Sequence, residues 1–446
     1  MADRSKKYDS RSILLTKNIL ASFFVKGWSA IVVLLMVPLT LKCLGSYQNG
    51  VWLTISSMLV WIDQMDIGLG NGLRNSLATH LAHGEKFEAR KVVSSTVAML
   101  SCITIPLAII LSLLIWTTDV YSFFNVDSDA IPELRVALCS AVILVCLTFV
   151  LKFINNVYTG LQLPAVSNLI MAICQTVSLI FTALIYFSGK ASFLDIVIIN
   201  TAAPLIVYTF SYTFTFYRKY VWLKPSIKAV DLTYSLNLGK IGIKFFWIQI
   251  ASVLQFMTAN ILISKFFTPE MVTPYQIAYR YMSLVIVAFT VICSPFWSAT
   301  TDAFEKSDIQ WIRNASNRLD GLMGILTLIL VLMTAASPII YRLWIGESCS
   351  VPFGMTVMMA IYVFLLIVSM RYSFFLNGIG ALKLQLYTSV SAVIFIPLAW
   401  IVSTTTHDII WFMSTMCICL IPGLVVNIIQ FNKIINGTAK GIWGTS

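Results

Sequence analysis

The chain has 446 residues, of which 58% are hydrophobic and only 11% are charged, and its formal net charge is +11. Soluble globular domains carry about a quarter of their residues charged. This composition therefore excludes a soluble globular protein, because so few charges cannot cover a water-facing surface of this size. Lipid is the solvent that fits, since helices satisfy their own backbone hydrogen bonds there.

Twelve apolar runs reach the length that a membrane-spanning helix needs, about 20 residues. Short breaks rich in glycine, proline and charge separate the runs. The runs cover residues 18–41, 49–76, 92–117, 132–157, 166–188, 194–217, 241–264, 274–299, 319–341, 353–376, 386–403 and 409–432. The first run is too long for the apolar core of a cleavable signal peptide. The sequence therefore predicts an all-α polytopic membrane protein with about 12 spanning helices.

Lysine and arginine are distributed unevenly over the breaks. Nineteen of the 30 basic residues fall in alternate segments that begin with the N-terminal one, and five fall in the segments between them. Cytoplasmic loops carry the excess of basic residues, so both termini are expected in the cytoplasm. This topology accounts for most of the positive charge, and nucleic acid is not expected as a partner.

The two halves of the chain resemble each other at an offset near 220 residues. The segments LKFINNVYTGLQL and MRYSFFLNGIGAL each contain a basic residue, Lys152 or Arg371, followed by a glycine-containing break. Six helices per repeat is an even number, so the halves have the same topology about an axis along the membrane normal. We predict two pseudo-symmetric six-helix bundles, residues 1–220 and 221–446, around a central cavity. Chance similarity between apolar segments is the alternative.

Six basic residues lie inside the apolar runs and are not explained by the loops. They are Lys26, Arg74, Lys152, Lys244, Arg280 and Arg371. A charge within the membrane costs several kcal/mol and marks either a functional site or an intramembrane ion pair. Four of the six lie within about two turns of a cytoplasmic helix end, where long side chains can extend to the headgroups. Lys26 and Arg280 lie deeper and are expected to line a hydrated cavity.

The second run, WIDQMDIGLGNGLRNSLA, combines acidic residues with glycines. Asp63, Asp66, Gly70 and Arg74 are spaced by three and four residues and form one stripe of a helix. Carboxylates this deep cannot reach the headgroups, so the two aspartates are also expected to line the cavity. A hinge or a close helix contact is expected where three glycines alternate, at Gly68, Gly70 and Gly72.

Metal and catalytic motifs do not stand out in the sequence. The nine cysteines include no CxxC pair, and the three histidines are scattered near loops. We therefore expect no metal, no cofactor and no enzymatic activity. The chain has no P-loop, so ATP is not expected as the direct driver.

The segment LGSYQNGVWLTISSMLVWIDQMDIGLGNGLRNSLATHLAHGE resembles a signature of bacterial polysaccharide exporters. These are the O-antigen-type flippases of lipid-linked oligosaccharide in the multidrug/oligosaccharidyl-lipid/polysaccharide (MOP) exporter superfamily. The matching elements are the Leu44–Gly45 turn, Gly50 two residues before an aromatic, the Asp66–Leu69 core and Arg74. The segments at 273–281 and 377–380 also fit. The resemblance implies the fold of MATE (multidrug and toxin extrusion) transporters, which belong to this superfamily.

The resemblance also implies a function. Such proteins translocate an undecaprenyl-diphosphate-linked oligosaccharide, an O-antigen or capsule repeat unit, across the bacterial inner membrane. Cations in a wet cavity would hold the diphosphate by charge-assisted hydrogen bonds. Lys26 and Arg280 are the first candidates, followed by Lys152, Arg371 and Arg74. The implied partners are the substrate, the lipid bilayer, and the polysaccharide polymerase with its assembly machinery.

Some members of the superfamily bind sodium through an acidic residue in the later helices. The seventh, eleventh and twelfth runs here contain no interior acid, which leaves Asp63 and Asp66 for coupling to H⁺ or Na⁺. A MATE-type multidrug/cation antiporter is the first alternative function, but acids would then dominate the interior. The second is a membrane-embedded polysaccharide polymerase or glycosyltransferase, for which we find neither a large outer loop nor an acidic motif.

Overall fold

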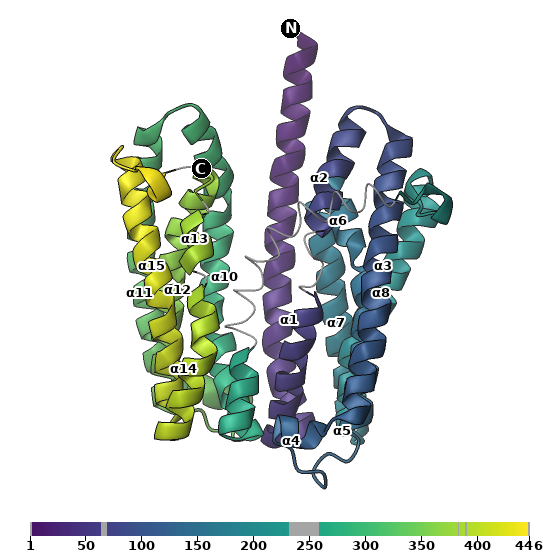
Figure 1. Ribbon diagram of the computed structural model, residues 1–446, viewed down its shortest axis with the longest axis vertical. Helices are drawn as coiled ribbons and strands as arrows, with labels where there is room; N and C mark the ends of the chain where they lie inside the picture. Colours follow the sequence, from purple (N-terminus) through teal and green to yellow (C-terminus); the bar gives the residue numbers. More distant parts are fainter. Residues whose placement is uncertain (1, 64–68, 232–257, 382, 389, 445–446) are drawn as a thin grey trace. The chain divides into compact units, whose positions relative to one another are not determined.

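The computed structural model describes residues 2–63, 69–231, 258–381, 383–388 and 390–444, and most of them are helical (Figure 1). Within these ranges, nine helices are long and apolar enough to cross a membrane. The predicted all-α, multi-pass architecture is therefore confirmed.

The twelve predicted runs map onto the helices with three differences. Most of the first run and the start of the second lie in the span Phe24–Ile62, which is kinked at Gly45, and the end of the second run lies in the helix Leu69–Ala82. Gly45 has φ 69° and ψ 175°, a backbone conformation that glycine adopts readily. Most of run 241–264 lies outside the described residues, and run 386–403 forms two short helices. Each of the other eight runs corresponds to one span.

The chain forms two compact units, residues 1–48 with 55–247, and residues 49–54 with 248–446. The first unit contains most of α1 (Ala2–Asp63), then α2 (Leu69–Ala82), α3 (Lys86–Thr117), α4 (Val120–Phe124), α5 (Leu134–Leu151), α6 (Phe153–Gly160), α7 (Pro164–Ser188), α8 (Phe193–Phe214), η1 (Thr215–Lys219), η2 (Val221–Leu223) and η3 (Ile227–Ala229). The second contains α10 (Pro269–Glu305), α11 (Ile309–Ile345), α12 (Phe353–Ile379), α13 (Lys383–Thr388), α14 (Val390–Thr406), α15 (Ile409–Ile435) and η4 (Gly441–Trp443).

Local sequence signals explain several helix ends. Ser192 and Asp195 form a reciprocal capping box at the start of α8, which satisfies two of the first backbone N–H groups. Gly189 and Gly380 follow α7 and α12 with φ of 69° and 83°. Glycine is the residue best suited to this left-handed position after a helix. At these breaks, the residue types in the sequence therefore explain where the helices begin and end.

Helix packing inside the two units follows one pattern. In the first unit α2 packs against α3 and α6, α3 against α5, α5 against α8, and α7 against α8. In the second unit α10 packs against α11 and α12, α11 against α12, α12 against α15, and α14 against α15. These pairs match in chain order, as a duplicated six-helix unit would require. The duplication and its bounds, residues 1–220 and 221–446, stay predictions.

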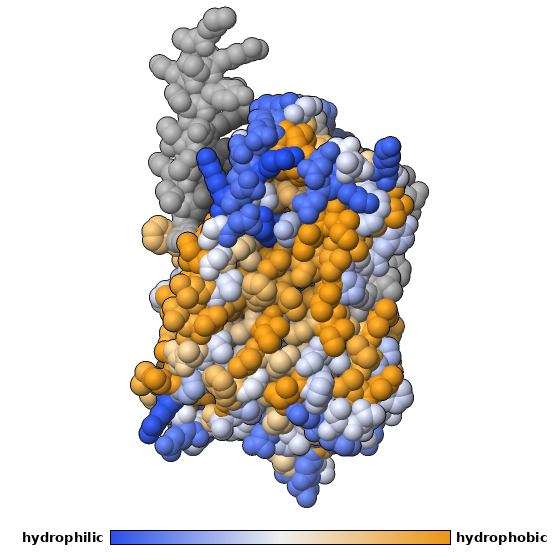
Figure 2. Space-filling model, turned by 90° about the vertical axis from the view of Figure 1, so that its left-hand side faces the viewer, coloured by the Kyte–Doolittle hydropathy of each residue, from blue (hydrophilic) through white to orange (hydrophobic). Residues whose placement is uncertain are grey.

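The surface of the second unit has the character of a membrane protein. Figure 2 shows a broad apolar band with hydrophilic residues at both ends. Large side chains that contribute to the exposed surface of this unit include Leu328, Leu332, Trp411 and Ile418. Exposed apolar side chains in such number fit hydrocarbon rather than water as the surrounding solvent.

Gly50 makes the closest backbone approach in the second unit. A Cβ at this position would lie 1.8 Å from the carbonyl oxygen of Pro269. The neighbouring Asn49 side chain donates to Thr273 Oγ1 at 3.3 Å, and Asn260 donates to the carbonyl of Leu53 at 3.3 Å. These contacts attach residues 49–54 to the second unit and give a physical reason for the glycine in the exporter-like signature.

We predict that Gly50→Ala destabilises the protein by about 1–3 kcal/mol, because a methyl group there overlaps the backbone of Pro269. The measurement is the thermal unfolding and membrane abundance of the variant. Gly324→Ala is the matched control, since nothing lies within 4 Å of a Cβ at that helical position. Equal stability of Gly50→Ala and the control would contradict the assigned contact.

Candidate functional site

Four polar residues of α10 form one face of the helix, which we call the α10 stripe. Gln276, Arg280, Ser283 and Thr290 are spaced by four, three and seven residues, which places them on one side of a helix. All four are half-buried. Gln276 Nε2 donates to Asn260 Oδ1 at 2.8 Å. Of the stripe, sequence reasoning identified only Arg280, because uncharged polar residues are common in spanning helices.

Arg280 lies well inside a helix that is long and apolar enough to cross a membrane. It follows the first residue of α10 by eleven residues, which is about 16 Å at 1.5 Å per residue. The hydrocarbon core is about 30 Å thick, so the guanidinium reaches neither headgroup region easily. A charge at this depth must face water or polar groups. Arg280 is therefore the strongest candidate among the predicted site residues.

Contacts on other faces of α10 fix the direction of the stripe. The Tyr275 hydroxyl donates to Met416 Sδ on α15 at 3.6 Å, and the Tyr281 hydroxyl donates to the Met333 carbonyl on α11 at 3.1 Å. Tyr275 and Tyr281 are buried. Because these contacts hold α10 on two sides, the helix cannot rotate freely and the half-buried stripe keeps its direction.

The first unit has a comparable polar face around Lys152. Lys152 forms the break between α5 and α6, and Asn156 and Thr159 follow at spacings of four and three. All three side chains are half-buried. Behind them, the Asn155 amide donates to the Tyr208 hydroxyl at 2.7 Å, while Asn155 Oδ1 accepts no hydrogen bond from the described residues. A buried acceptor of this kind is suited to bind water or a hydroxyl.

Arg371 and Lys152 have matching positions, each 18 residues after the first residue of α12 or α5, but their surroundings differ. Arg371 is buried, forms an ion pair with Asp320, and donates to the Ser316 carbonyl at 3.0 Å and to Ser316 Oγ at 2.8 Å. These contacts join α12 to α11. Sequence reasoning missed Asp320 as a partner because it stands at the very start of a predicted run.

Lys26 and Arg74 lie on helices of the first unit, and both side chains are exposed. Lys26 precedes the Gly45 kink by 19 residues, or about 28 Å of helix. This distance nearly equals the core thickness, so the Lys26 ammonium can reach the headgroups at the other edge. Its neighbour Trp28 donates to Thr176 Oγ1 at 2.9 Å and ties α1 to α7. Arg74 is exposed on α2.

The acidic and glycine-rich part of the second run is described only in part. Asp63 is the last residue of α1, while its side chain, Asp66 and Gly68 lie outside the described residues. Both Gly70 and Gly72 lie in the first turn of α2, where Gly70 is buried and Gly72 is half-buried. The coupling role of the aspartates and the hinge role of the glycines therefore stay predictions.

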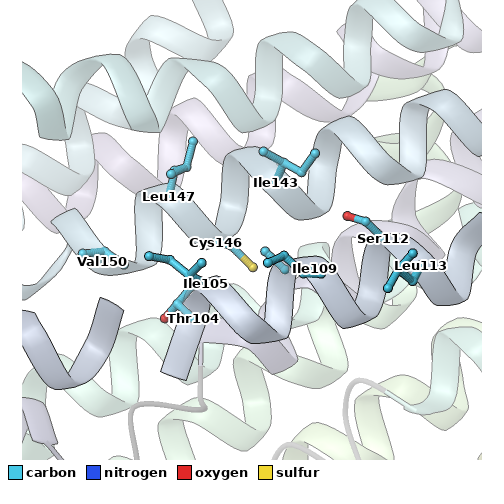
Figure 3. A pocket seen from close by; sticks show the side chains of 10 residues that line it. Thr104, Ile105, Ile109, Ser112, Leu113, Ile143, Cys146, Leu147 and Val150 are labelled. Carbon is cyan, nitrogen blue, oxygen red and sulfur yellow. The ribbon is translucent and has the colours of Figure 1, made fainter. Parts of the chain in front are cut away.

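An apolar groove lies between α3 and α5 (Figure 3). It has a volume of about 440 Å³, and its surface is almost entirely apolar. The residues that line it are Thr104, Ile105, Ala108, Ile109, Ser112, Leu113, Ile143, Cys146, Leu147 and Val150. Sugar hydroxyls would lose their water there without gaining partners, so this groove is not the site for an oligosaccharide.

The fold is that of the MATE transporters of the MOP superfamily. The chain is similar to the inward-facing structure of a multidrug resistance MATE family transporter of this superfamily, with a TM-score of 0.72, 15% identity, and coverage of 94% of this chain and 96% of the other. A MOP superfamily transporter from Pyrococcus furiosus, described for the reverse polarity of its binding pocket, gives a TM-score of 0.61, 13% identity and 96% coverage of both chains. This confirms the predicted fold class.

Two named proteins are similar in sequence. The chain is 22% identical over 390 residues, 86% of both chains, to a proposed O-antigen export protein of Yersinia pseudotuberculosis. It is 21% identical over 323 residues, 72% of this chain and 70% of the other, to a proposed O-antigen transporter of Salmonella typhimurium strain LT2. No family model matches the chain. The resemblance seen in the sequence thus points to the same group of proteins as these relatives.

We predict that Arg371 stabilises the second unit. Arg371→Ala leaves Ser316 and Asp320 without their donor, and should reduce the free energy of unfolding by about 1–3 kcal/mol. Asp320 is partly exposed, which limits the ionic share of this loss. A double-mutant cycle with Asp320→Ala, followed by thermal unfolding, measures the coupling. Purely additive losses in stability would show that the pair contributes nothing.

Proposed function

We propose that this protein is a flippase that translocates an oligosaccharide linked to undecaprenyl diphosphate across the bacterial inner membrane. The single observation that carries the proposal is Arg280, a cation eleven residues into the helix α10, on a half-buried polar face. A diphosphate is a dianion and needs such a cation within the membrane. The relatives named for O-antigen export or transport support the sugar-lipid class of substrate.

Each unit contributes one polar face to the proposal, and each face is considered by itself. Arg280 and the α10 stripe provide charge and amide groups for the diphosphate and the first sugars. Lys152, Asn156 and Thr159 provide a second cation with hydroxyl and amide groups. Sugar hydroxyls exchange their water for these groups, while the isoprenoid tail stays in the bilayer. We assign Lys26 and Arg74 to the headgroup region, where they meet the substrate only as it enters or leaves.

The basic residues set the orientation in this proposal. Both termini lie in the cytoplasm, because the segments rich in lysine and arginine alternate along the chain. The polysaccharide polymerase and assembly machinery are the proposed consumers of the product.

A multidrug antiporter is the second candidate, and it is favoured by the similarity to MATE multidrug transporters. Such a protein needs interior acids to bind cationic drugs. Arg280 and Lys152, by contrast, are cations on half-buried polar faces within spans. An anionic substrate therefore fits better than a cationic one.

We predict that Arg280→Gln abolishes surface polysaccharide while membrane abundance of the protein stays normal. The substitution keeps the polar face and removes only the charge that holds the diphosphate. Arg280→Lys should retain part of the activity, since a cation remains. Arg342→Gln is the control, because this arginine lies exposed in the last turn of α11. Wild-type polysaccharide in Arg280→Gln cells would rule out the role.

We further predict that Asp66→Asn removes any dependence of transport on an H⁺ or Na⁺ gradient. Asp63 and Asp66 are the proposed coupling groups, and an amide cannot gain or lose a proton or balance a bound cation. Transport into vesicles with and without an imposed ion gradient measures this. Gradient dependence that persists in both Asp66→Asn and Asp63→Asn would contradict ion coupling through these residues.

A further inference from the structure

Residues 215–231, which we call the connector, follow α8 and fold back onto the start of α3 (Figure 1). Arg90 Nε donates to the Lys224 carbonyl at 2.8 Å. The Ser226 N–H donates to Ser94 Oγ at 3.1 Å, and the Asp231 N–H donates to Ser95 Oγ at 2.8 Å. The connector is therefore a fixed structural element rather than a loose loop.

The inner side of the connector is buried and its outer side is apolar and exposed. Phe216 and Leu223 are completely buried. On the outer side Ile227 is 93% exposed, and Tyr217 and Val221 are each 56% exposed. Phe87, in the first turn of α3, is 69% exposed. Folding of the chain does not account for these side chains, so they require another environment.

Cations accompany these exposed apolar groups. The connector contains Arg218, Lys219, Lys224 and Lys228, and its one acid, Asp231, is paired with Lys91 at 2.8 Å. Lys224 Nζ lies 3.8 Å from the ring centre of Tyr217, and Lys219 Nζ lies 5.5 Å from that of Tyr220. Cations and aromatic rings therefore share the outer side of the connector.

The connector also lies at the level of the lipid headgroups. The span Phe193–Lys219 ends inside it, and the span Lys86–Thr117 begins beside it. Basic clusters next to the end of a spanning helix attract anionic lipids. Aromatic and apolar side chains mixed with lysine and arginine are typical of segments that lie in the membrane interface.

We propose that the connector is a binding site for anionic phospholipid headgroups. Its four basic side chains contact the lipid phosphates, and Ile227 and Val221 enter the boundary between headgroups and acyl chains. Under the orientation proposed above, these lipids belong to the cytoplasmic leaflet. The lipid-binding proposal does not depend on the transported substrate. It can fail while the proposed function holds, and the proposed function can fail while lipid binding holds.

The test is native mass spectrometry of the full-length protein in detergent, titrated with phosphatidylglycerol or with phosphatidylcholine. The wild-type protein should bind phosphatidylglycerol preferentially. The variant Arg218→Gln, Lys219→Gln, Lys224→Gln, Lys228→Gln should bind it at least tenfold more weakly, with phosphatidylcholine binding unchanged. The control removes four exposed cations elsewhere, through Lys306→Gln, Arg318→Gln, Lys383→Gln and Lys440→Gln.

Phosphatidylglycerol binding within twofold of wild type in the connector variant would overturn the proposal. So would an equal loss in the control, which would indicate a general charge effect. No preference for phosphatidylglycerol in the wild-type protein would overturn it too, and would favour a protein partner for this surface. If the connector variant does not fold, the wild-type protein is titrated at high salt instead. Its preference for phosphatidylglycerol over phosphatidylcholine should weaken there, because salt ions screen the basic side chains. An unchanged preference would reject the proposal.

Discussion

A charge inside hydrocarbon must find water, a counter-ion or the headgroups, and the rest of this structure depends on how each interior cation meets that requirement. Arg371 finds a counter-ion in Asp320 and donates two hydrogen bonds to Ser316. Lys26 lies close enough to one edge of the core to reach headgroups. Arg280 lies deeper in its helix, and in the proposed function its polar face contacts the anionic group of the substrate.

The need of polar groups for partners inside the membrane also explains why polar residues gather on a few helix faces. Outside the α10 stripe, α10 is held by buried tyrosines that donate to Met416 and to the Met333 carbonyl. A helix fixed in this way presents one polar face consistently. Gly50 serves the same end by letting residues 49–54 approach Pro269 closely enough for Asn49 and Asn260 to form their hydrogen bonds.

The helical type and eight of the spans could be predicted run by run from the sequence, because hydrophobicity and length decide them in lipid. The Gly45 kink and the glycine after α12 were predictable for a similar reason, since few residues other than glycine accept those conformations. Contacts between distant helices were not predictable. Nothing in the sequence pairs Asp320 with Arg371, and nothing shows that Gln276, Ser283 and Thr290 share the side of Arg280 until the helix limits are known.

The most direct measurement of the central claim uses purified protein in vesicles that contain an undecaprenyl-diphosphate-linked oligosaccharide. A membrane-impermeant enzyme outside the vesicles modifies only the sugars in the outer leaflet. The account predicts that wild-type protein makes nearly all of the substrate accessible, while vesicles without protein leave about half protected. Protection of the same fraction with and without the protein would contradict the assignment as a flippase.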